Sequence, residues 1–360
     1  MTAISTKQAV ICWIDDDIEK SSSNARRRLN EFRKDKRLLF IPLHPALVND
    51  YLEKPKRAPD LFLVDYRLNK EPSTSGKTYP FAGTSIAGLL RDTYPEQPIY
   101  LTSALIASAH VSEETDLFDR TIPDAELTKP KGKSILLYDS LAYRRIRTSR
   151  GRSNVKTLAD LLKAPALSGQ YVINALPDDL RDGLGKRHDN VVSTSEALGL
   201  SGTIRFARWI TRTLLRNPGI LYDDLYAATL LGMSEDYFNS RLVNVLRKHE
   251  LGPTLEYVGV FNETYPRYWW KAALSKLVLG HPDVRDQKVS KVWELAPEIF
   301  RVNKKNRARC IVCRKPFPET VGVDLDDEDR RGPVHWHCSE PHPDKQPILH
   351  FEQVRILLDS

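Results

Sequence analysis

The chain has 360 residues, more than one compact domain usually holds, so its length predicts two or three domains. Its formal charge of +7 modestly favours an anionic partner, and four cysteines fit a reducing compartment better than a disulfide-rich secreted scaffold. No apolar run is long enough to span a membrane and no charged-then-apolar leader follows Met1, so we expect a cytoplasmic protein without a membrane partner.

Three apolar runs in the first third of the chain have the character of buried strands, and each is followed by acidic or hydroxyl residues. Helical stretches such as 85–91 lie between them, a pattern that predicts a parallel sheet with crossover helices. In such sheets the carboxyl ends of the strands form the site. The runs are 10–14, 61–64 and 99–101, and the residues at their ends are Asp15, Asp16, Asp65 and Thr102.

Three clustered carboxylates repel one another unless a divalent cation lies among them, and hard oxygen ligands favour Mg²⁺. A carboxylate held beside that cation can attack a phosphoryl donor and form an acyl phosphate. A hydroxyl and an amine nearby would stabilise the charge on the incoming oxygens. We therefore expect Asp65 to be the nucleophile.

The segments ICWIDDD, DLFLVDYRL, PIYLTSA and ELTKP together resemble the receiver domain of response regulators. The resemblance implies a doubly wound α/β fold with a five-stranded parallel sheet, phosphorylated by a histidine kinase or phosphotransfer protein. It also implies that Asp15, Asp16 and Asp65 hold Mg²⁺, that Asp65 is the phosphoacceptor, and that Thr102 and Lys129 contact the phosphoryl group.

Composition changes along the rest of the chain suggest further domains. A stretch rich in arginine, 143–156, marks a linker or the end of the last receiver helix, and 167–190 is polar. Beyond it the pattern is mostly helical. We predict a receiver domain (1–142), a basic linker and polar connector (143–200), a helical output domain (201–300) and a small zinc-stapled module (301–360).

Residues 221–251 have the pattern of a helix-turn-helix. Gly232 permits a turn, Ser234 can cap the second helix, and the expected buried face of that helix is Phe238, Leu242, Val245 and Leu246. The LGMS turn and the LRKHEL ending resemble the DNA-binding helix pair of LuxR-type regulators. That resemblance places Tyr237, Asn239, Ser240 and Arg241 in a major groove, and Arg247 and Lys248 on phosphates.

The C-terminal region contains two close pairs of metal-ligand residues. Cys310 and Cys313 form a C-x2-C, and after 21 residues His335 and Cys338 form an H-x2-C. Four such ligands hold a structural Zn²⁺ tetrahedrally and leave it no open position for catalysis. His337 and His342 are alternative nitrogen donors, whereas Cys12 lies in a receiver strand and is expected to be a buried thiol.

Two kinds of output remain open on the sequence. In one, phosphorylation of Asp65 controls DNA binding by the helical, zinc-containing region, which also has seven basic residues between Arg301 and Lys315. In the other, the chain is a protein-binding adaptor or phosphoryl sink in a multicomponent pathway, such as one of cellular defence, and binds an effector protein. The aromatic stretch 265–270 is then core or a docking face. We find no catalytic motif for an external substrate in 150–360, so we expect no enzyme activity beyond self-phosphorylation and slow hydrolysis.

Overall fold

The computed structural model describes residues 8–53, 58–68, 82–103, 117–149, 155–177, 201–281, 291–311, 313–315, 320–324 and 331–335. The chain divides into two compact units. The first contains 1–157 and 177–210, and the second contains 158–176 and 211–360. The region predicted as a linker, 143–200, is thus shared between the two units.

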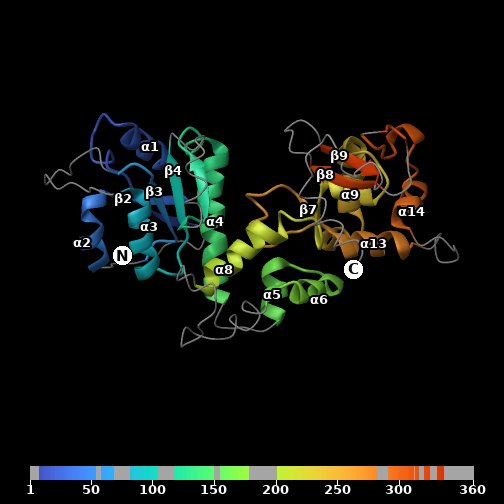
Figure 1. The fold of residues 1–360 in the computed structure, drawn as a ribbon, viewed down its shortest axis with the longest axis horizontal. Coiled ribbons are helices and arrows are strands. Elements are labelled where there is room, and N and C mark those ends of the chain that lie inside the picture. The colour runs from blue at the N-terminus through green and yellow to red at the C-terminus, as the bar shows by residue number, and fades with distance from the viewer. Residues whose placement is uncertain are drawn as a thin grey trace, which may run out of the picture. The chain divides into compact units, whose positions relative to one another are not determined.

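The first unit is built on a five-stranded, all-parallel sheet with strand order β2-β1-β3-β4-β5 (Figure 1). This confirms the predicted receiver-type sheet. Its strands are β1 (Ala9–Ile14), β2 (Leu38–Leu43), β3 (Leu61–Asp65), β4 (Ile99–Ser103) and β5 (Arg120–Pro123). The helices of this unit are α1 (Asn24–Phe32), η1 (Pro45–Leu47), α2 (Val48–Glu53), α3 (Gly83–Thr93), α4 (Pro130–Ser149) and α8 (Gly202–Trp209).

Both faces of the sheet are buried. Successive strand residues point to opposite sides of the sheet, and helices cover both sides. Phe62 and Leu101 pack with Ile86 and Leu90 of α3 in the core of one face. On the other face Trp13 contacts Phe32 of α1 edge to face, with 5.9 Å between ring centroids. The Tyr100 hydroxyl on that second face donates to Asp139 of α4 at 2.6 Å. The sheet therefore lies between α2 with α3 and α1 with α4.

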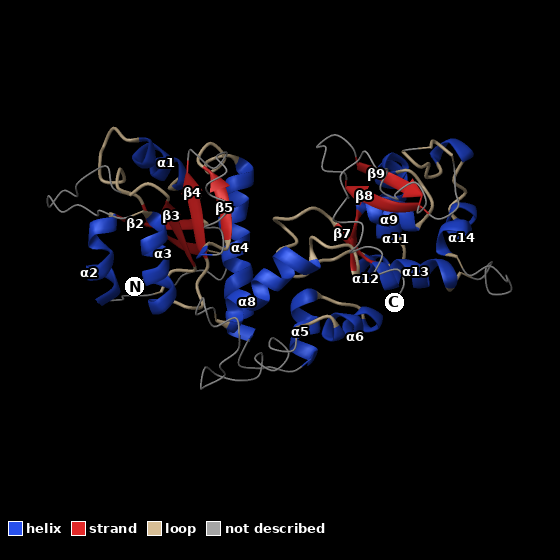
Figure 2. Cartoon of the chain, in the orientation of Figure 1, coloured by secondary structure: helices blue, strands red, loops and turns tan. Residues whose placement is uncertain are grey.

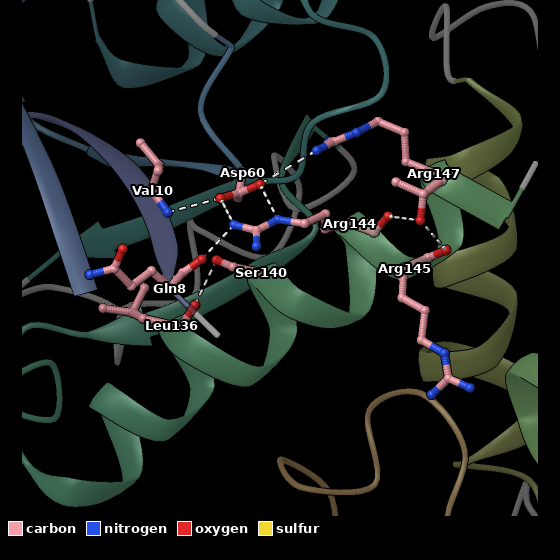
Figure 3. Close-up of polar contacts among 9 residues, drawn as sticks. Gln8, Val10, Asp60, Leu136, Ser140, Arg144, Arg145 and Arg147 are labelled. Atoms are coloured by element: carbon pink, nitrogen blue, oxygen red, sulfur yellow. Dashed lines mark hydrogen bonds and ion pairs between the residues drawn. The ribbon is translucent and has the colours of Figure 1, made fainter. Parts of the chain in front are cut away.

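Helix α4 is anchored beneath the sheet by an aspartate that precedes β3 (Figure 3). The buried carboxylate of Asp60 accepts from the backbone N–H of Val10 at 2.8 Å and from Nε of Arg144 at 2.8 Å. Arg144 also donates to the carbonyl of Gln8 at 2.6 Å, and Arg147 lies 3.5 Å from Asp60. The first half of the basic stretch is therefore the end of the last receiver helix, and two of its arginines have structural partners.

A second buried aspartate, which precedes β5, ties α8 to the same unit. Asp119 is paired with Arg91 of α3 and with Nε of Arg208 at 2.8 Å, and it accepts from the N–H of Ile99 at 2.8 Å. Opposite charges lower the pKa of this carboxyl in spite of its burial, which by itself would raise it. Arg208 is only 9% exposed, because it meets Asp119.

The second unit is mainly helical and carries two small antiparallel sheets of two strands each, β6-β7 and β8-β9 (Figure 2). The chain enters it within α5. Its helices are α5 (Val155–Leu162), α6 (Ala166–Asn174), η6 (Ile210–Leu214), α9 (Asp224–Leu230), α10 (Glu235–Tyr237), η7 (Phe238–Leu242), α11 (Val243–Lys248), α12 (Gly252–Leu255), α13 (Lys271–Leu279), α14 (Val292–Ile299) and η9 (Lys304–Asn306). Its strands are β6 (Leu221–Asp223), β7 (Tyr268–Trp270), β8 (Thr320–Asp324) and β9 (Arg331–His335).

The aromatic stretch 265–270 contributes to the core of the second unit. Trp269 and Trp270 lie on β7 and are fully buried, and the indole N–H of Trp269 donates to Asp224 at 2.8 Å. This confirms the core interpretation and excludes these two rings from any docking face. Among the described helices, none is both long and apolar enough to cross a membrane.

Candidate functional site at the carboxyl edge of the sheet

The structure brings four of the predicted site residues to one edge of the sheet. Asp15 and Asp16 directly follow β1, and Asp65 is the last residue of β3, which pairs with β1. Thr102 lies opposite Asp65 in the register of β3 and β4. Asp15 and Asp16 are 8% and 4% exposed and Thr102 is fully buried. Strand pairing alone thus determines this grouping, as the sequence predicted.

The carboxyl groups at this edge disfavour one another's ionisation. Burial is the main cause that raises the pKa of Asp65 to about 8, and the carboxylates of Asp15, Asp124 and Asp16 raise it further. Burial also raises the pKa of Asp15 to about 7, although the N–H of Asp17 opposes this by donating to its carboxylate at 2.8 Å. A cation at this edge would therefore be stabilised strongly.

A fourth carboxylate at this edge was missed on the sequence. Asp124 directly follows β5, and the Thr102 hydroxyl donates to its Oδ1 at 3.0 Å. Its Oδ2 lies 2.7 Å from the guanidinium of Arg28 on α1. The sequence did contain a signal for Asp124, because this residue also directly follows a strand at the same edge. It contained none for Arg28, one of four arginines among residues 26–33.

Lys129 does not join these contacts. Its ammonium group lies 2.6 Å from Glu126, three residues earlier, and its side chain is 58% exposed. Five residues separate it from the end of β5, because the chain turns through 124–129 before α4 begins at Pro130. Arg28 is the basic side chain that a described contact brings to this edge, through its ion pair with Asp124.

Within the described ranges, no three or more His, Cys, Asp or Glu side chains form a group that could hold a metal ion. The Mg²⁺ that the receiver resemblance implies requires fewer protein ligands, because Mg²⁺ binds through one or two carboxylates and keeps several waters. The carboxyls of Asp15 and Asp65 raise each other's pKa values, and a divalent cation between them would relieve that repulsion. Their donor chemistry therefore fits Mg²⁺.

The predicted helix-turn-helix segment does form two helices joined by a turn. Gly232 adopts a left-handed conformation with φ of 67°, and the Ser234 hydroxyl accepts from the N–H of Tyr237 at 3.4 Å as the cap of the second helix. Phe238, Leu242 and Leu246 are buried as predicted. Val245 is 55% exposed, so its assignment to the buried face is wrong, and Val243 is buried instead.

The residues predicted to contact DNA have mixed environments. Arg247 forms a bidentate pair with Glu256 at 2.8 and 2.7 Å, and Asn239 accepts from Arg267. The Ser240 hydroxyl donates to the carbonyl of Asp236 at 2.6 Å. Tyr237 is partly buried, whereas Arg241 and Lys248 are exposed. The charge of Arg247 is therefore already compensated within the protein.

The zinc prediction is only partly within the described residues. Cys310 is buried and Cys313 partly buried, and neither is in a disulfide with another described residue. The turn between them is closed by the N–H of Arg314, which donates to the carbonyl of Cys310 at 2.9 Å, and the N–H of Ile311 donates to Pro333 of β9 at 2.9 Å. His335 ends β9, but nothing is described of its side chain, and Cys338, His337 and His342 lie outside the described residues.

Comparison with known proteins gives no family by sequence: no family model and no curated protein matches the chain. Solved structures with similarity include the receiver domain of a Francisella response regulator, at 16% identity over 38% of this chain and 98% of that chain, with a TM-score of 0.27. The receiver domain of an HD domain-containing protein from Pseudomonas fluorescens has 15% identity over 41% of this chain and 98% of that chain, with a TM-score of 0.30. The response regulator RcsB of Salmonella typhimurium has 11% identity over 43% of this chain and 82% of that chain, with a TM-score of 0.27.

The fold of the first unit is assigned from the chain itself. A parallel sheet of order 2-1-3-4-5 with helices on both faces is the flavodoxin-like arrangement, which receiver domains share. Acidic residues follow β1 and end β3, at the edge where such folds bind ligands. The N-terminal part of the chain therefore has a receiver-type fold.

Proposed function

We propose that this protein is a receiver-type signalling protein that accepts a phosphoryl group on Asp65. The observation that supports this best is the carboxyl group of Asp65, partly buried at the carboxyl edge of the sheet beside Asp15 and opposite Thr102 in the strand register. The receiver-type fold implies a histidine kinase or a phosphotransfer protein as the donor.

The reaction we propose is a phosphoryl transfer between oxygens. A carboxylate oxygen of Asp65 attacks the phosphorus of the donor, the bond from phosphorus to the leaving group breaks, and an acyl phosphate forms. Asp15, Asp16 and Asp65 are the residues we propose to hold Mg²⁺, directly or through its bound waters, and the bound ion would neutralise charge on the phosphoryl oxygens. Deprotonated Asp65 is the reactive form, so a cation that lowers its raised pKa also favours attack. We propose no external substrate.

The test uses the full-length protein, Mg²⁺ and acetyl phosphate as a small-molecule donor. Intact-mass measurement should show one added phosphoryl group in the wild-type protein and none in Asp65→Asn. Asp92→Asn is the matched control, because Asp92 is an exposed aspartate on α3 of the same unit. Equal phosphorylation of wild type and Asp65→Asn would reject Asp65 as the phosphoacceptor.

DNA binding by the helical unit is our candidate output. The turn at Gly232, the cap at Ser234 and the exposed basic side chains Arg241 and Lys248 favour it. Affinity measured over a salt series should fall steeply with salt, and Arg241→Ala should weaken it. Arg247→Ala should have a smaller effect, because Arg247 is paired with Glu256. Absence of binding at low salt would leave the protein-binding adaptor as the output.

We propose that the C-terminal segment binds one structural Zn²⁺ through Cys310, Cys313, His335 and Cys338. The closed turn at Cys310–Cys313 and its hydrogen bond to β9, which ends at His335, support the approach of the two ligand pairs. Elemental analysis should find one zinc per chain, and Cys310→Ser should remove it. A protein that contains no zinc and does not lose stability with a chelator would contradict this proposal.

A further inference from the structure

The contacts of Asp124 are those that a phosphoryl group on Asp65 would need. One carboxylate oxygen accepts from the Thr102 hydroxyl at 3.0 Å, and the other lies 2.7 Å from the Arg28 guanidinium. A hydroxyl and a cation are the groups that stabilise charged phosphoryl oxygens. Thr102 lies opposite Asp65 in the strand register, and the negative charge of Asp124 is close enough to raise the pKa of Asp65.

Resting on the phosphorylation proposed above, we propose that Asp124 is an internal competitor of the phosphoryl group and that Arg28 is the cation that binds this group. In the unphosphorylated protein the carboxylate of Asp124 occupies Thr102 and Arg28. A phosphoryl group on Asp65 takes over both contacts, because two anions cannot share them at this edge, and Asp124 is displaced.

The displacement has a route into the rest of the unit. Asp124 begins the turn that leads directly into α4, and the N–H of Leu127 donates to the carbonyl of Asp124 at 3.4 Å. The turn is short, since α4 starts at Pro130. Release of Asp124 therefore frees the β5–α4 turn on one side of the sheet and, through Arg28, the contact with α1 on the same side.

The experiment titrates full-length protein with beryllofluoride in the presence of Mg²⁺, and measures initial rates of phosphorylation by acetyl phosphate. Asp124→Asn removes the competing charge and should tighten beryllofluoride binding by about tenfold, which corresponds to about 1.4 kcal/mol. Arg28→Ala should weaken it by a similar factor, and Arg28→Lys should restore part of the loss. Arg27→Ala, at the neighbouring exposed position on α1, is the matched control and should change little.

The opposite signs expected for Asp124→Asn and Arg28→Ala separate this inference from a general loss of structure, which thermal unfolding of each variant checks independently. The inference is overturned if Asp124→Asn weakens binding in a folded protein, or if Arg28→Ala leaves binding unchanged. Neither result would affect the proposed phosphorylation of Asp65, which is rejected if the wild-type protein takes up no phosphoryl group or if Asp65→Asn takes up as much as the wild type.

A second inference concerns a cavity of about 650 Å³ in the second unit, a size typical of small-molecule sites. Helix α13 forms one wall with Lys271, Ser275 and Leu279, which share a helix face because they are four residues apart. Tyr171 of α6 lies on the cavity lining as well. Tyr171 and Leu279 are 62% and 42% exposed, which is unusual for large apolar side chains.

The polar side chains of this cavity include serine hydroxyls and lysine ammonium groups. Lys271 and Lys276 both line it, and no carboxylate partner of either is found in the described part of the chain. The ammonium of Lys271 instead lies 5.4 Å from the centre of the Tyr222 ring. Ser168, also on the lining, is 1% exposed, and its hydroxyl has no hydrogen-bond partner among the residues described. A buried hydroxyl without a partner is costly, so a ligand that supplies an acceptor would be favoured.

The geometry points to a binding site for a small organic anion with an apolar body. Its carboxylate, sulfonate or phosphate group lies at the lysines, and its apolar part lies against Leu279 and Tyr171. The ligand is a small molecule because the lining comes from two neighbouring helices and the short connection at Gly219 and Ile220.

Calorimetric titration of the full-length protein with naphthalenesulfonate, and with neutral naphthalenemethanol, tests this. The sulfonate should bind at least about tenfold more tightly than the alcohol. The double variant Lys271→Gln, Lys276→Gln should lose this preference, and Lys248→Gln, an exposed lysine on α11, should keep it. Equal affinities for the two probes, a preference that survives in the double variant, or no binding of the sulfonate by the wild-type protein would overturn the inference.

Discussion

At the scale of single residues, the carboxyl groups of Asp15 and Asp65 make the stability of the first unit depend on pH. Their pKa values of about 7 and about 8 lie above those of an unfolded chain. At pH values between the unfolded and the folded pKa of each group, the folded protein therefore binds more protons than the unfolded protein. The stabilisation is fully present below the unfolded pKa and is lost as the pH rises through about 7 and 8.

In metal-free buffer the free energy of unfolding of the first unit should therefore fall between about pH 5 and about pH 8.5. Asp65→Asn should reduce this fall by at least about 1 kcal/mol, because one pKa unit corresponds to about 1.4 kcal/mol. Mg²⁺ should recover part of the loss at the higher pH. Urea unfolding at both pH values measures it, with Asp92→Asn as the control. A stability that rises over this interval would contradict the assigned pKa shifts.

The residues of the site differ in how far their positions follow from sequence. Asp15, Asp65 and Thr102 each adjoin or end an apolar strand, and parallel pairing then brings them to one edge. The position of Lys129 depends on the length of the turn after β5, and that of Arg28 on which side of α1 faces the edge. Tertiary packing sets both, so the distances of these two cations from the edge could not be predicted from sequence alone.

At the scale of elements, the turn between α9 and α10 depends on a glycine for two reasons. Gly232 has φ of 67°, and a Cβ there would lie 2.3 Å from the carbonyl oxygen of Trp293. Gly232→Ala should therefore destabilise the second unit by about 2 kcal/mol or more. Gly88→Ala on α3 is the control, because a Cβ there meets nothing within 4 Å, and it should stabilise by about 0.5 to 1 kcal/mol. Thermal unfolding measures both, and equal effects would contradict the role of Gly232.

The second helix of this pair shows why its buried face was predicted only in part. The α-helical spacing holds through Phe238 and Leu242, which are buried. Residues 238–242 form a π-helix, whose i to i+5 bonding shifts the faces of the residues that follow. Val243 and Leu246 are consequently buried and Val245 is exposed. A local change of helix type is not visible in a pattern of apolar residues.

Helix α4 provides a comparison of two neighbouring arginines (Figure 3). Arg144 pairs with Asp60, whose side chain is only 6% exposed, whereas Arg145 is exposed. Arg144→Ala leaves a buried carboxylate with less compensation and should lower stability by about 2 to 3 kcal/mol. Arg145→Ala removes the same charge from the next position and should change stability by less than about 0.5 kcal/mol. Denaturant unfolding distinguishes them, and similar losses would show that helix propensity or net charge is responsible.

At the scale of the whole molecule, the two units are not continuous in sequence. Residues 158–176 belong to the second unit, yet α8, which follows them, belongs to the first. Sequence divides a chain only at changes in composition, so the prediction placed α8 with the output domain. The buried pair of Arg208 and Asp119, distant in sequence, is what assigns α8 to the first unit.

This division predicts that the protein unfolds in more than one step. Two compact units with separate cores need not unfold together, so calorimetry should resolve two transitions. Mg²⁺ with beryllofluoride binds only the folded first unit and should raise only its transition, because a ligand stabilises the unit that binds it. A zinc chelator should lower only the other transition. Asp65→Asn should abolish the first shift and Cys310→Ser the second. A single transition that both treatments move together would show that the two units unfold as one. In that case a ligand that stabilises the first unit would also stabilise the second unit.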